Sequence, residues 1–461
     1  MTYTYKFKND SEQEVERYVG IESYSTPDFE GIGGIFKDNY KDFIVKEITE
    51  NGKILEIKED RETPPYLRNR DNYTTFNLIK INKVTFKALS QIARELKIPK
   101  HKLYYSGLKD KRSISVQKIS IEGNYVPELK KLNLRDLFIR SITPTKKPVL
   151  MGSNRGNNFT IAIRKIKPRE GLKNHIQGLM NVLSQIGFPN YFGLQRFGKY
   201  RPNSHLIGKY LLEEDYERAF KEFVTTTYSS ENKSLYKVRK KIERSLNNPK
   251  KLRKAYKTFP KSLNFECTLI EHLLQFPQDY VGAFKQLDDD IINLLINAFQ
   301  SFIFNKLISL RTKKGISLLK PVKGDVVCIL DDFKGNITDT RYLYGNRFDK
   351  YIEQAMELDR AAIVVPIIGY DTNLDNFPLM KSLFNEVSQN EGINREIFDS
   401  RFLNKFNLKG AYRAMMVKPI GLSLVEFDDD DVYKSCKKLK IEFSLNKGSY
   451  ATMLLREMMK N

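Results

Sequence analysis

Hydrophobic residues recur along the chain at helical spacing in some segments and at every second position in others. Over 85–98 the spacing is helical, and Thr85 is placed to cap the start of the helix. A broad apolar stripe over 288–311 predicts a second helix, one that belongs to a core and not to a binding surface. The apolar positions are Phe86, Leu89, Ile92, Ala93 and Leu96 in the first segment and Leu294, Leu295, Ala298, Phe299, Phe302, Ile303, Leu307 and Leu310 in the second.

The strand-like segments are short and are separated by turn residues; they cover 43–45, 103–105, 113–116 and 159–166. Ser106-Gly107 favours a turn between the second and the third, and such joins indicate antiparallel pairing. The alternation shifts phase near Gln117-Lys118, which predicts a β-bulge there. Helices interleaved with mostly antiparallel strands place the chain in the α+β class.

Length and charge narrow the class of partner. A chain of 461 residues with 41% hydrophobic positions predicts two folded domains. The net charge of +22 is spread along the sequence and attracts polyanions, either nucleic acid or an anionic membrane surface. No apolar run approaches the ~20 residues that cross a bilayer, and the first residues lack the apolar core of a signal peptide. We therefore expect a cytoplasmic protein with no membrane partner.

Cysteine and histidine are sparse and scattered. Cys267, Cys328 and Cys436 are odd in number and far apart, which suits a reducing compartment. The four histidines show no zinc-site spacing with them, so we expect no metal.

The segment 237–257 is strongly basic, with ten basic residues and one acid, Glu243. Asn247-Asn248-Pro249 interrupts its helical pattern, which predicts a helical hairpin. Whether this charge also binds RNA is left open by the sequence.

The most suggestive polar segment is 106–112, SGLKDKR, in which Asp110 is surrounded by Lys109, Lys111 and Arg112. Nearby cations keep the carboxylate ionised. One reading of Asp110 is structural, since Asp stabilises turns and pairs with lysine. The other is chemical: a carboxylate that acts on the sugar or base of a bound RNA.

The SGLKDKRSISVQ segment resembles the signature loop of the TruD family of tRNA pseudouridine synthases. Further segments resemble other blocks of that family in the same order along the chain. They are GIFKDNYKDFIVKEI from Gly34, GNNFTIAIR from Gly156, NYFGLQRFG from Asn190, SHLIG from Ser204, AFQSFIFN from Ala298, VVPIIGYD from Val364 and FSLNKGSYATMLLRE from Phe443. The resemblance implies a pseudouridine-synthase catalytic domain over 1–189 and 416–461, with a family-specific domain inserted over 190–415.

The resemblance also implies roles for single residues. Asp110 matches the catalytic aspartate, and Lys37 a basic residue of the active site. Asn157 and Phe159 match the GN-x-F motif, and Tyr450 a C-terminal aromatic position. Ser113 and Ser115 depart from the usual Ala and Thr, and Tyr450 stands where some relatives carry Phe.

Each of these residues also has a plain structural reading. In this structural interpretation, Lys37 is an exposed lysine at the edge of a strand and Phe159 is a core residue of a strand. Asn157 then belongs to a turn after Gly156. We assign phosphate contacts to Lys109 and Arg112. The set of candidate RNA-binding residues is completed by Gln195 and Arg196; Arg196 either holds a phosphate or braces the active-site loop.

The reaction that the resemblance implies isomerises uridine to pseudouridine in tRNA. The resemblance suggests uridine 13 as the target, and since some relatives act on other sites, other RNA substrates are left open. The reaction adds and removes nothing, so no cofactor is expected. An extruded base would stack on Phe159, and Asn157 would read the uracil edge. Whether Asp110 attacks the sugar, attacks the base or removes a sugar proton is left open, and a monomer is the default.

Two other classes of function compete with this interpretation. The first is an RNA-binding protein of the same fold without catalysis, against which Asp110, Lys37, Asn157 and Phe159 count together. The second is a methyltransferase, for which Gly31–Gly34 lacks the following helix pattern.

Overall fold

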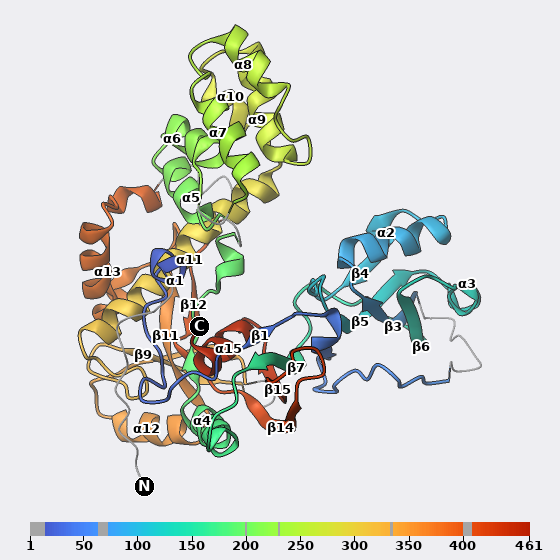
Figure 1. Cartoon of the computed structure of the whole chain (residues 1–461). Coiled ribbons are helices and arrows are strands. Elements are labelled where there is room, and N and C mark those ends of the chain that lie inside the picture. Colours follow the sequence, from blue (N-terminus) through green and yellow to red (C-terminus); the bar gives the residue numbers. More distant parts are fainter. Residues whose placement is uncertain (1–13, 63–71, 199–200, 229–230, 332–334, 400–407) are drawn as a thin grey trace.

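The computed structural model describes residues 14–62, 72–198, 201–228, 231–331, 335–399 and 408–461 (Figure 1). Its helices are α1 (Glu14–Tyr18), α2 (Thr85–Glu95), α3 (Val126–Lys131), α4 (Leu172–Ile186), α5 (Ser204–Leu212), α6 (Tyr216–Phe220), α7 (Lys233–Glu243), α8 (Pro249–Tyr256), α9 (Asn264–Gln275), α10 (Tyr280–Phe284), α11 (Asp289–Lys313), α12 (Asp349–Glu357), α13 (Pro378–Asn390) and α15 (Ala451–Met459).

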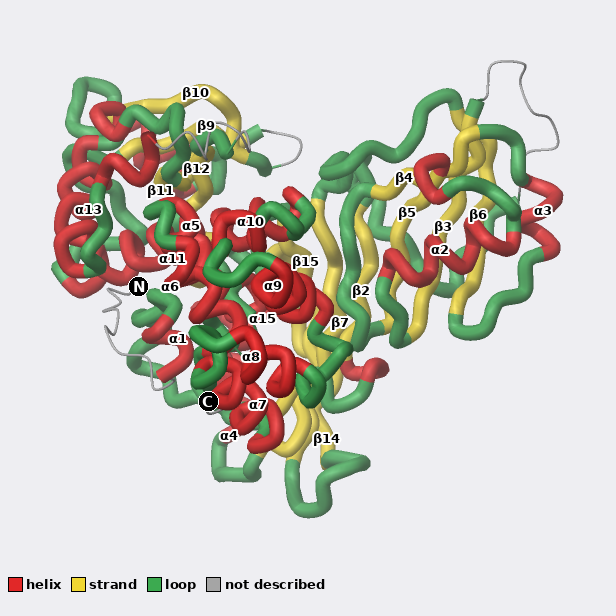
Figure 2. Tube along the Cα trace, turned by 90° about the horizontal axis from the view of Figure 1, so that it is seen from above, coloured by secondary structure: helices red, strands yellow, loops and turns green. Residues whose placement is uncertain are grey.

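The described residues form a nine-stranded sheet that runs through the molecule (Figure 2). Its strands are β1 (Ile35–Phe36), β2 (Phe43–Ile48), β3 (Tyr73–Ile81), β4 (Leu103–Tyr105), β5 (Ile114–Glu122), β6 (Leu137–Thr145), β7 (Gly156–Ile166), β14 (Ile420–Asp429) and β15 (Lys437–Asn446). The order is β14-β15-β7-β2-β5-β3-β6, with β1 on β7 and β4 on β5. All pairs are antiparallel except β2–β5. The predicted α+β class is confirmed.

One face of this sheet carries two separate hydrophobic cores. Phe159 lies beside Val45 in the register of β7 and β2, and both belong to the larger core, to which α4 and α15 contribute. On β5 and β3, Ile119 and Leu78 belong to a second core together with α2. Between the two cores the same face carries polar side chains, because Ser115 continues the register from Val45 and Lys80 continues it from Ser115. We call this polar strip the seam.

The predicted bulge at Gln117-Lys118 is wrong. β5 pairs with β3 in continuous register from Ile114 to Glu122. The apparent phase shift has another cause: Ser115 and Gln117 point to the same face as Ile119 and Ile121. That face is polar at the seam and apolar under α2, so the period of two is never broken.

The segment 190–415 leaves and re-enters the sheet domain at one place. β8 (Phe188–Pro189) pairs with β13 (Met416–Val417). Between them the structure shows a second sheet, in the order β10 (Ile337–Leu343), β9 (Val326–Leu330), β11 (Ala361–Ile367) and β12 (Ala411–Ala414). The long helix α11 is apolar enough to cross a membrane, but 72% of its apolar window is buried inside the protein. It is the core helix that the pattern predicts. The domain boundaries themselves stay a prediction.

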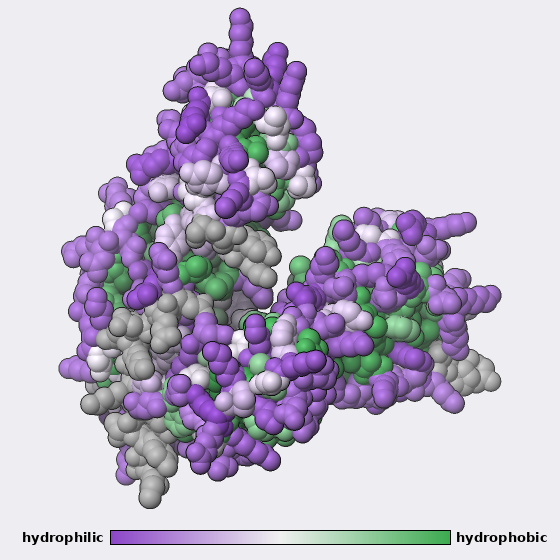
Figure 3. All heavy atoms as spheres, in the orientation of Figure 1, coloured by the Kyte–Doolittle hydropathy of each residue, from purple (hydrophilic) through white to green (hydrophobic). Residues whose placement is uncertain are grey.

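Two parts of the molecule rise from a common body (Figure 1). One is a helical arm made of α5–α10, and the other is a sheet lobe made of β3–β6 with α2 and α3. The surface between the helical arm and the sheet lobe is hollowed (Figure 3). The helical hairpin predicted over 237–257 is confirmed as α7 and α8, and Asn248 caps α8 by accepting from the Lys251 N–H.

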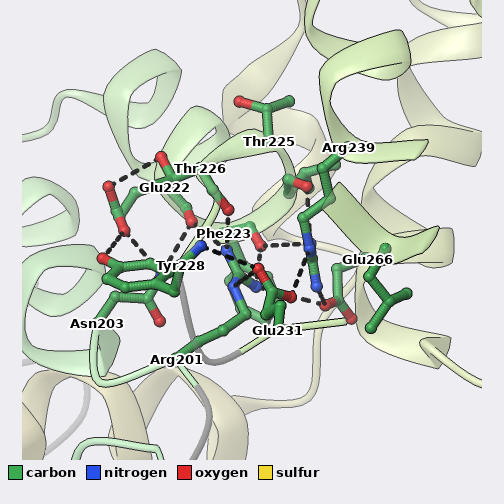
Figure 4. A network of polar contacts seen from close by, with 12 residues as sticks. Arg201, Asn203, Glu222, Phe223, Thr225, Thr226, Tyr228, Glu231, Arg239 and Glu266 are labelled. Atoms are coloured by element: carbon green, nitrogen blue, oxygen red, sulfur yellow. Dashed lines mark hydrogen bonds and ion pairs between the residues drawn. The ribbon is translucent and has the colours of Figure 1, made fainter. Parts of the chain in front are cut away.

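A buried polar network holds the helical arm together (Figure 4). A π-helical turn, Lys221–Thr225, follows α6 and leaves backbone carbonyls without helical donors. The Arg201 guanidinium donates to the carbonyls of Glu222 and Phe223, each at 2.8 Å, and Arg239 donates to that of Val224 at 2.7 Å. Arg239 also pairs with Glu231 at 2.9 Å and Glu266 at 3.0 Å. The arm is thus braced by charge-assisted hydrogen bonds.

The two ends of the described chain are joined at the body. The Glu457 carboxylate of α15 accepts from the backbone N–H of Ser25 at 2.9 Å and from the Thr26 hydroxyl at 2.9 Å. Arg456 pairs with Glu16 of α1 at 2.7 Å. Asn305 of α11 in turn donates to the Val19 carbonyl at 3.1 Å. The segment 14–26 therefore contacts both α15 and the inserted segment.

Candidate active site

The 106–112 loop joins β4 to β5 beside the seam, as the sequence predicts. It is anchored by side chains from the sheet and from α2. The Ser106 hydroxyl donates to Glu47 at 2.7 Å, and Gln117 donates to the Gly107 carbonyl at 3.2 Å. The Lys109 N–H donates to the Thr85 hydroxyl at 3.1 Å. Such anchors fix the backbone of the loop in one conformation.

Thr85 does not cap α2, contrary to prediction. The N-cap position is Val84, which makes no side-chain cap. The Thr85 hydroxyl contacts Lys109 and Gln117 instead. The helix ends at Glu95, short of the predicted Ile98. The hydroxyl is therefore used to hold the loop and not the helix.

Asp110 and Lys37 form an ion pair, with Lys37 Nζ 2.8 Å from Asp110 Oδ2. The Asp110 side chain is 39% exposed and that of Lys37 is 16% exposed, so a ligand can reach the carboxylate. The Lys37 ammonium also lies 3.9 Å from the centre of the Phe43 ring, a cation–π contact. The structure thus brings together the two residues that the resemblance singles out.

Lys37 is placed by the short link between β1 and β2. Its backbone is left-handed, with φ 57°, which turns the chain out of β1. Asn39 and Asp42 then form a capping box around a single 3-10 turn. Arg164 of β7 donates to Asp42 at 2.8 Å and so ties this turn to the sheet. The ammonium is held toward Asp110 by a rigid link.

Lys80 is a buried cation beneath Asp110 that the sequence analysis missed. Its ammonium donates to the Asp110 backbone carbonyl at 2.5 Å, and the Ser113 hydroxyl donates to the same oxygen at 2.7 Å. Burial lowers the pKa of Lys80 from 10.5 to about 8, although the negative charge of Asp110 opposes the shift. The sequence pattern of β3 could have revealed it, because Lys80 is in phase with Phe76 and Leu78 and therefore points inward.

Replacing Lys80 with Met is expected to lower activity about tenfold to a hundredfold without lowering stability at pH 7. Charging Lys80 costs the folded state free energy, and the unfolded chain binds more protons between pH 8 and 10.5. Wild-type stability should therefore rise across that window by about 3 kcal/mol relative to the variant. Unfolding curves of both proteins across this pH range provide the test; stabilities that change in parallel with pH would contradict a Lys80 pKa lowered by burial.

The assignment of Lys109 as a phosphate contact is wrong in this structure. Its Nζ lies 2.7 Å from Glu47 Oε2, and the two side chains are 4% and 2% exposed. Glu47 is in phase with Phe43 and Val45 and so faces the seam. Because the Lys109 ammonium is buried in an ion pair, it cannot reach a phosphate without breaking that pair. Glu47 was missed, although the period of two in β2 marks it as an inward carboxylate.

Arg112 is exposed and lies beside the link that holds Lys37. Its guanidinium donates to the Asp38 backbone carbonyl. The neighbouring Lys111 is exposed as well. A phosphate contact by Arg112 is compatible with this position and stays a prediction.

Phe159 and Asn157 lie on the same face of β7, next to the seam. Phe159 stacks on Phe443 with ring centres 5.4 Å apart and meets the edge of Phe43 at 6.0 Å. Phe159 is 8% exposed, so most of its ring belongs to the core, in agreement with its interpretation as a core residue of a strand. Asn157 pairs in register with Glu47. The Asn157 Oδ1 atom is buried and accepts no hydrogen bond from any described residue.

A second group of rings and cations gathers where the inserted segment begins. Arg413 lies 4.3 Å above the Phe192 ring and 5.4 Å from that of Tyr450. It donates to the Asn190 side chain at 2.6 Å, and burial lowers its pKa to about 10. Tyr450 follows β15, in which Leu445 pairs with Asn157, so this group borders the same end of β7. Arg413 was missed, since nothing in its local sequence sets it apart.

Arg196 belongs to the same group and is braced by the protein. It donates to the Ser301 hydroxyl of α11 at 3.2 Å and lies 5.8 Å from the Phe192 ring. Gln195 beside it is exposed. Arg196 thus has a partner in α11, as expected if it braces the protein. RNA contacts by Gln195 and Arg196 stay predictions.

The described His, Cys, Asp and Glu residues include no group of three that would hold a metal ion. The expectation of a metal-free site stays a prediction.

Comparison with known proteins matches residues 18–458 to the family model of tRNA pseudouridine synthase D (TruD). The chain belongs to the TruD family. A relative in Methanosarcina mazei, named probable tRNA pseudouridine synthase D, is 31% identical over 97% of this chain and 98% of its own length. One of the same name in Methanosarcina barkeri is also 31% identical, over 97% of this chain and 98% of its own length.

The fold agrees with this membership. A crystal structure of the Methanosarcina mazei TruD protein matches with a TM-score of 0.78 at 29% identity, over 97% of this chain and 98% of that one. The family resemblance seen in the sequence is therefore confirmed. Membership of the TruD family makes the chain an isomerase that converts uridine to pseudouridine in tRNA.

Proposed function

We propose that this protein isomerises uridine 13 of tRNA, with Asp110 as the nucleophilic carboxylate that acts on the extruded nucleotide. The observation that carries the proposal is the Asp110–Lys37 ion pair of 2.8 Å, open to solvent at the seam. Ammonium ions keep a neighbouring carboxylate charged and oriented. Uridine 13 is the position that the family resemblance suggests, and the comparisons with known proteins support tRNA as the substrate.

The reaction breaks the C1′–N1 bond, turns the uracil and joins C5 to C1′. The proton on C5 leaves and N1 gains one, so the product is an isomer of the substrate. The Asp110 carboxylate beside the sugar supplies the nucleophile, and its ion pair with Lys37 holds it in place. The rigid anchors of the 106–112 loop keep Asp110 from moving away during the turn of the base.

Recognition of the base is assigned to Asn157 with Phe159 and Tyr450. The Asn157 Oδ1 is a buried acceptor that receives no hydrogen bond from the part of the chain that the structure describes, and a buried acceptor without a donor costs free energy. The N3–H of uracil is a hydrogen-bond donor, which is the partner that the Asn157 Oδ1 acceptor needs. Phe159 and Tyr450 supply the aromatic surface against which the extruded base would rest.

The RNA itself fits the charge of the molecule. The net charge of +22 attracts a polyanion, and the hollow between the helical arm and the sheet lobe is where we place it (Figure 3). Arg112 and Arg196 are our candidates for phosphate contacts in it. We further propose that the protein acts as a monomer in the cytoplasm, which its three free cysteines suit.

The test is tritium release from tRNA transcripts labelled at C5 of uridine. We expect release from wild-type tRNA and none from a transcript with cytidine at position 13. Release that persists in the cytidine transcript would reject uridine 13 as the target while keeping the activity. Absence of release from every tRNA offered would reject the proposed function itself.

A further inference from the structure

Large apolar side chains stand exposed around the 106–112 loop. Leu108, two residues before Asp110, is 68% exposed. Met151 is also 68% exposed, Leu150 is 62% exposed, and Phe86 is 58% exposed. We call these residues the apolar rim. Exposed apolar groups that gather beside a site mark a surface that contacts a partner.

Hydrogen bonds place each part of the rim next to the loop. The Gly152 N–H donates to the Ser106 carbonyl at 2.7 Å, which brings the 150–153 turn against the loop. That turn is closed by the Ser153 N–H on the Leu150 carbonyl at 3.1 Å, with Gly152 at φ +72°. It therefore presents Met151 at its tip. Phe86 follows Thr85, whose hydroxyl holds Lys109.

Leu108 is exposed because the backbone on both sides of it is fixed. The Gly107 carbonyl accepts from Gln117, and the Lys109 N–H donates to Thr85. The Lys109 side chain points inward to Glu47. The chain thus holds Leu108 outward while its neighbours are anchored, and a side chain held in this way loses little freedom on contact with a partner.

Cations lie close in sequence to Leu108 of the apolar rim. Lys111 and Arg112 of the same loop are exposed, and Lys37 lies against Asp110. Figure 3 shows hydrophobic side chains on the part of the sheet lobe that borders the hollow, among hydrophilic ones. Apolar groups next to positive charge match RNA, in which phosphates flank a stack of bases. An anionic lipid surface also places phosphates beside apolar groups, but the match to the tRNA pseudouridine synthase D family favours RNA as the partner.

We propose that Leu108 is a wedge that enters the base stack of the RNA and fills the space left by the extruded uridine, with Met151 and Phe86 against the flanking bases. This proposal rests on the proposed function. An extruded base leaves its neighbours without a stacking partner, and apolar side chains such as Leu and Met fill such gaps in other nucleic-acid complexes. The position of Leu108 near Asp110 puts the wedge beside the nucleotide that reacts.

The test compares Leu108→Ala with Leu358→Ala, a matched control whose leucine is 73% exposed and follows α12, outside the site. Single-turnover isomerisation of tRNA should fall about tenfold or more in Leu108→Ala and stay unchanged in the control. Leu108→Met, which keeps an apolar side chain of similar volume, should restore most of the rate. Because Leu108 is exposed, its truncation should leave the melting temperature unchanged.

A second measurement follows base extrusion directly. Each variant is combined with Asp110→Asn, and 2-aminopurine is placed next to the target uridine. Binding should raise the fluorescence in the Asp110→Asn and Asp110→Asn/Leu358→Ala proteins, and the rise should be lost with Leu108→Ala. A normal rate in Leu108→Ala, or a full fluorescence rise despite a reduced rate, would overturn the wedge. Failure of the proposed function is recognised separately, because the wild type would then release no tritium.

Discussion

Asp110→Asn is expected to abolish isomerisation, with a loss of at least about a thousandfold in kcat, while tRNA binding survives. The amide keeps the size of the side chain and removes the charge that the reaction needs. Binding should not weaken, because the variant presents one negative charge fewer to the phosphates. Tritium release under single-turnover conditions measures the first effect, and filter binding at fixed salt measures the second.

Stability should change little in Asp110→Asn. The Asp110–Lys37 pair is partly exposed, and exposed pairs contribute about 0–1 kcal/mol. The matched control is Asp359→Asn, whose carboxylate pairs with Lys418 at 2.6 Å on the surface. The control should keep full activity. Normal turnover by Asp110→Asn would show that another group performs the chemistry.

Lys109→Met is expected to destabilise the protein by about 3–5 kcal/mol. Its removal leaves the Glu47 carboxylate buried without a cation, and an uncompensated buried charge is costly. The hydroxyl of Ser106 and the N–H of Lys118 would still donate to Glu47, but neither carries a full charge. Chemical unfolding of the variant and the wild type at pH 7 measures the loss.

Two further variants separate this structural role from a phosphate contact. Glu47→Gln/Lys109→Met removes both charges and should recover much of the stability that Lys109→Met loses. Lys111→Met removes an exposed neighbouring cation and should leave stability unchanged. A Lys109→Met protein with wild-type stability and a weaker salt dependence of tRNA binding would show that Lys109 contacts a phosphate after all.

The sequence was sufficient for the elements with strong periodicity. The long stripe over 288–311 predicted the core helix, and the break at Asn248-Pro249 predicted the hairpin of α7 and α8. Local hydrogen bonding was harder to foresee. Thr85 lies where a cap is expected, but the 106–112 loop offers its hydroxyl a competing partner that is distant in sequence.

The candidate site was predicted unevenly for a similar reason. Asp110 stood out locally as a carboxylate among cations, whereas its catalytic role and the choice of Lys37 came from a family resemblance, since nothing local to either residue shows that the two meet. Lys109 was misjudged because a run of adjacent cations looks uniformly exposed, although neighbouring side chains point in different directions. Glu47 and Lys80 carried a usable signal, each being a charged residue in phase with buried apolar neighbours on its strand.

The contact of α15 with the segment 14–26 bears on how the chain acquires its fold during synthesis. Ser25 and Glu457 are 432 positions apart, so the contacts between the segment 14–26 and α15 form only after the long stretch of chain between them has been made. Folding that depends on such distant partners is slow, because the entropy cost of closing a long loop comes before the stabilising contacts form. A nascent chain halted before Ala451 would leave the Ser25 and Thr26 donors without the Glu457 carboxylate, although the contact of Val19 with α11 can already form.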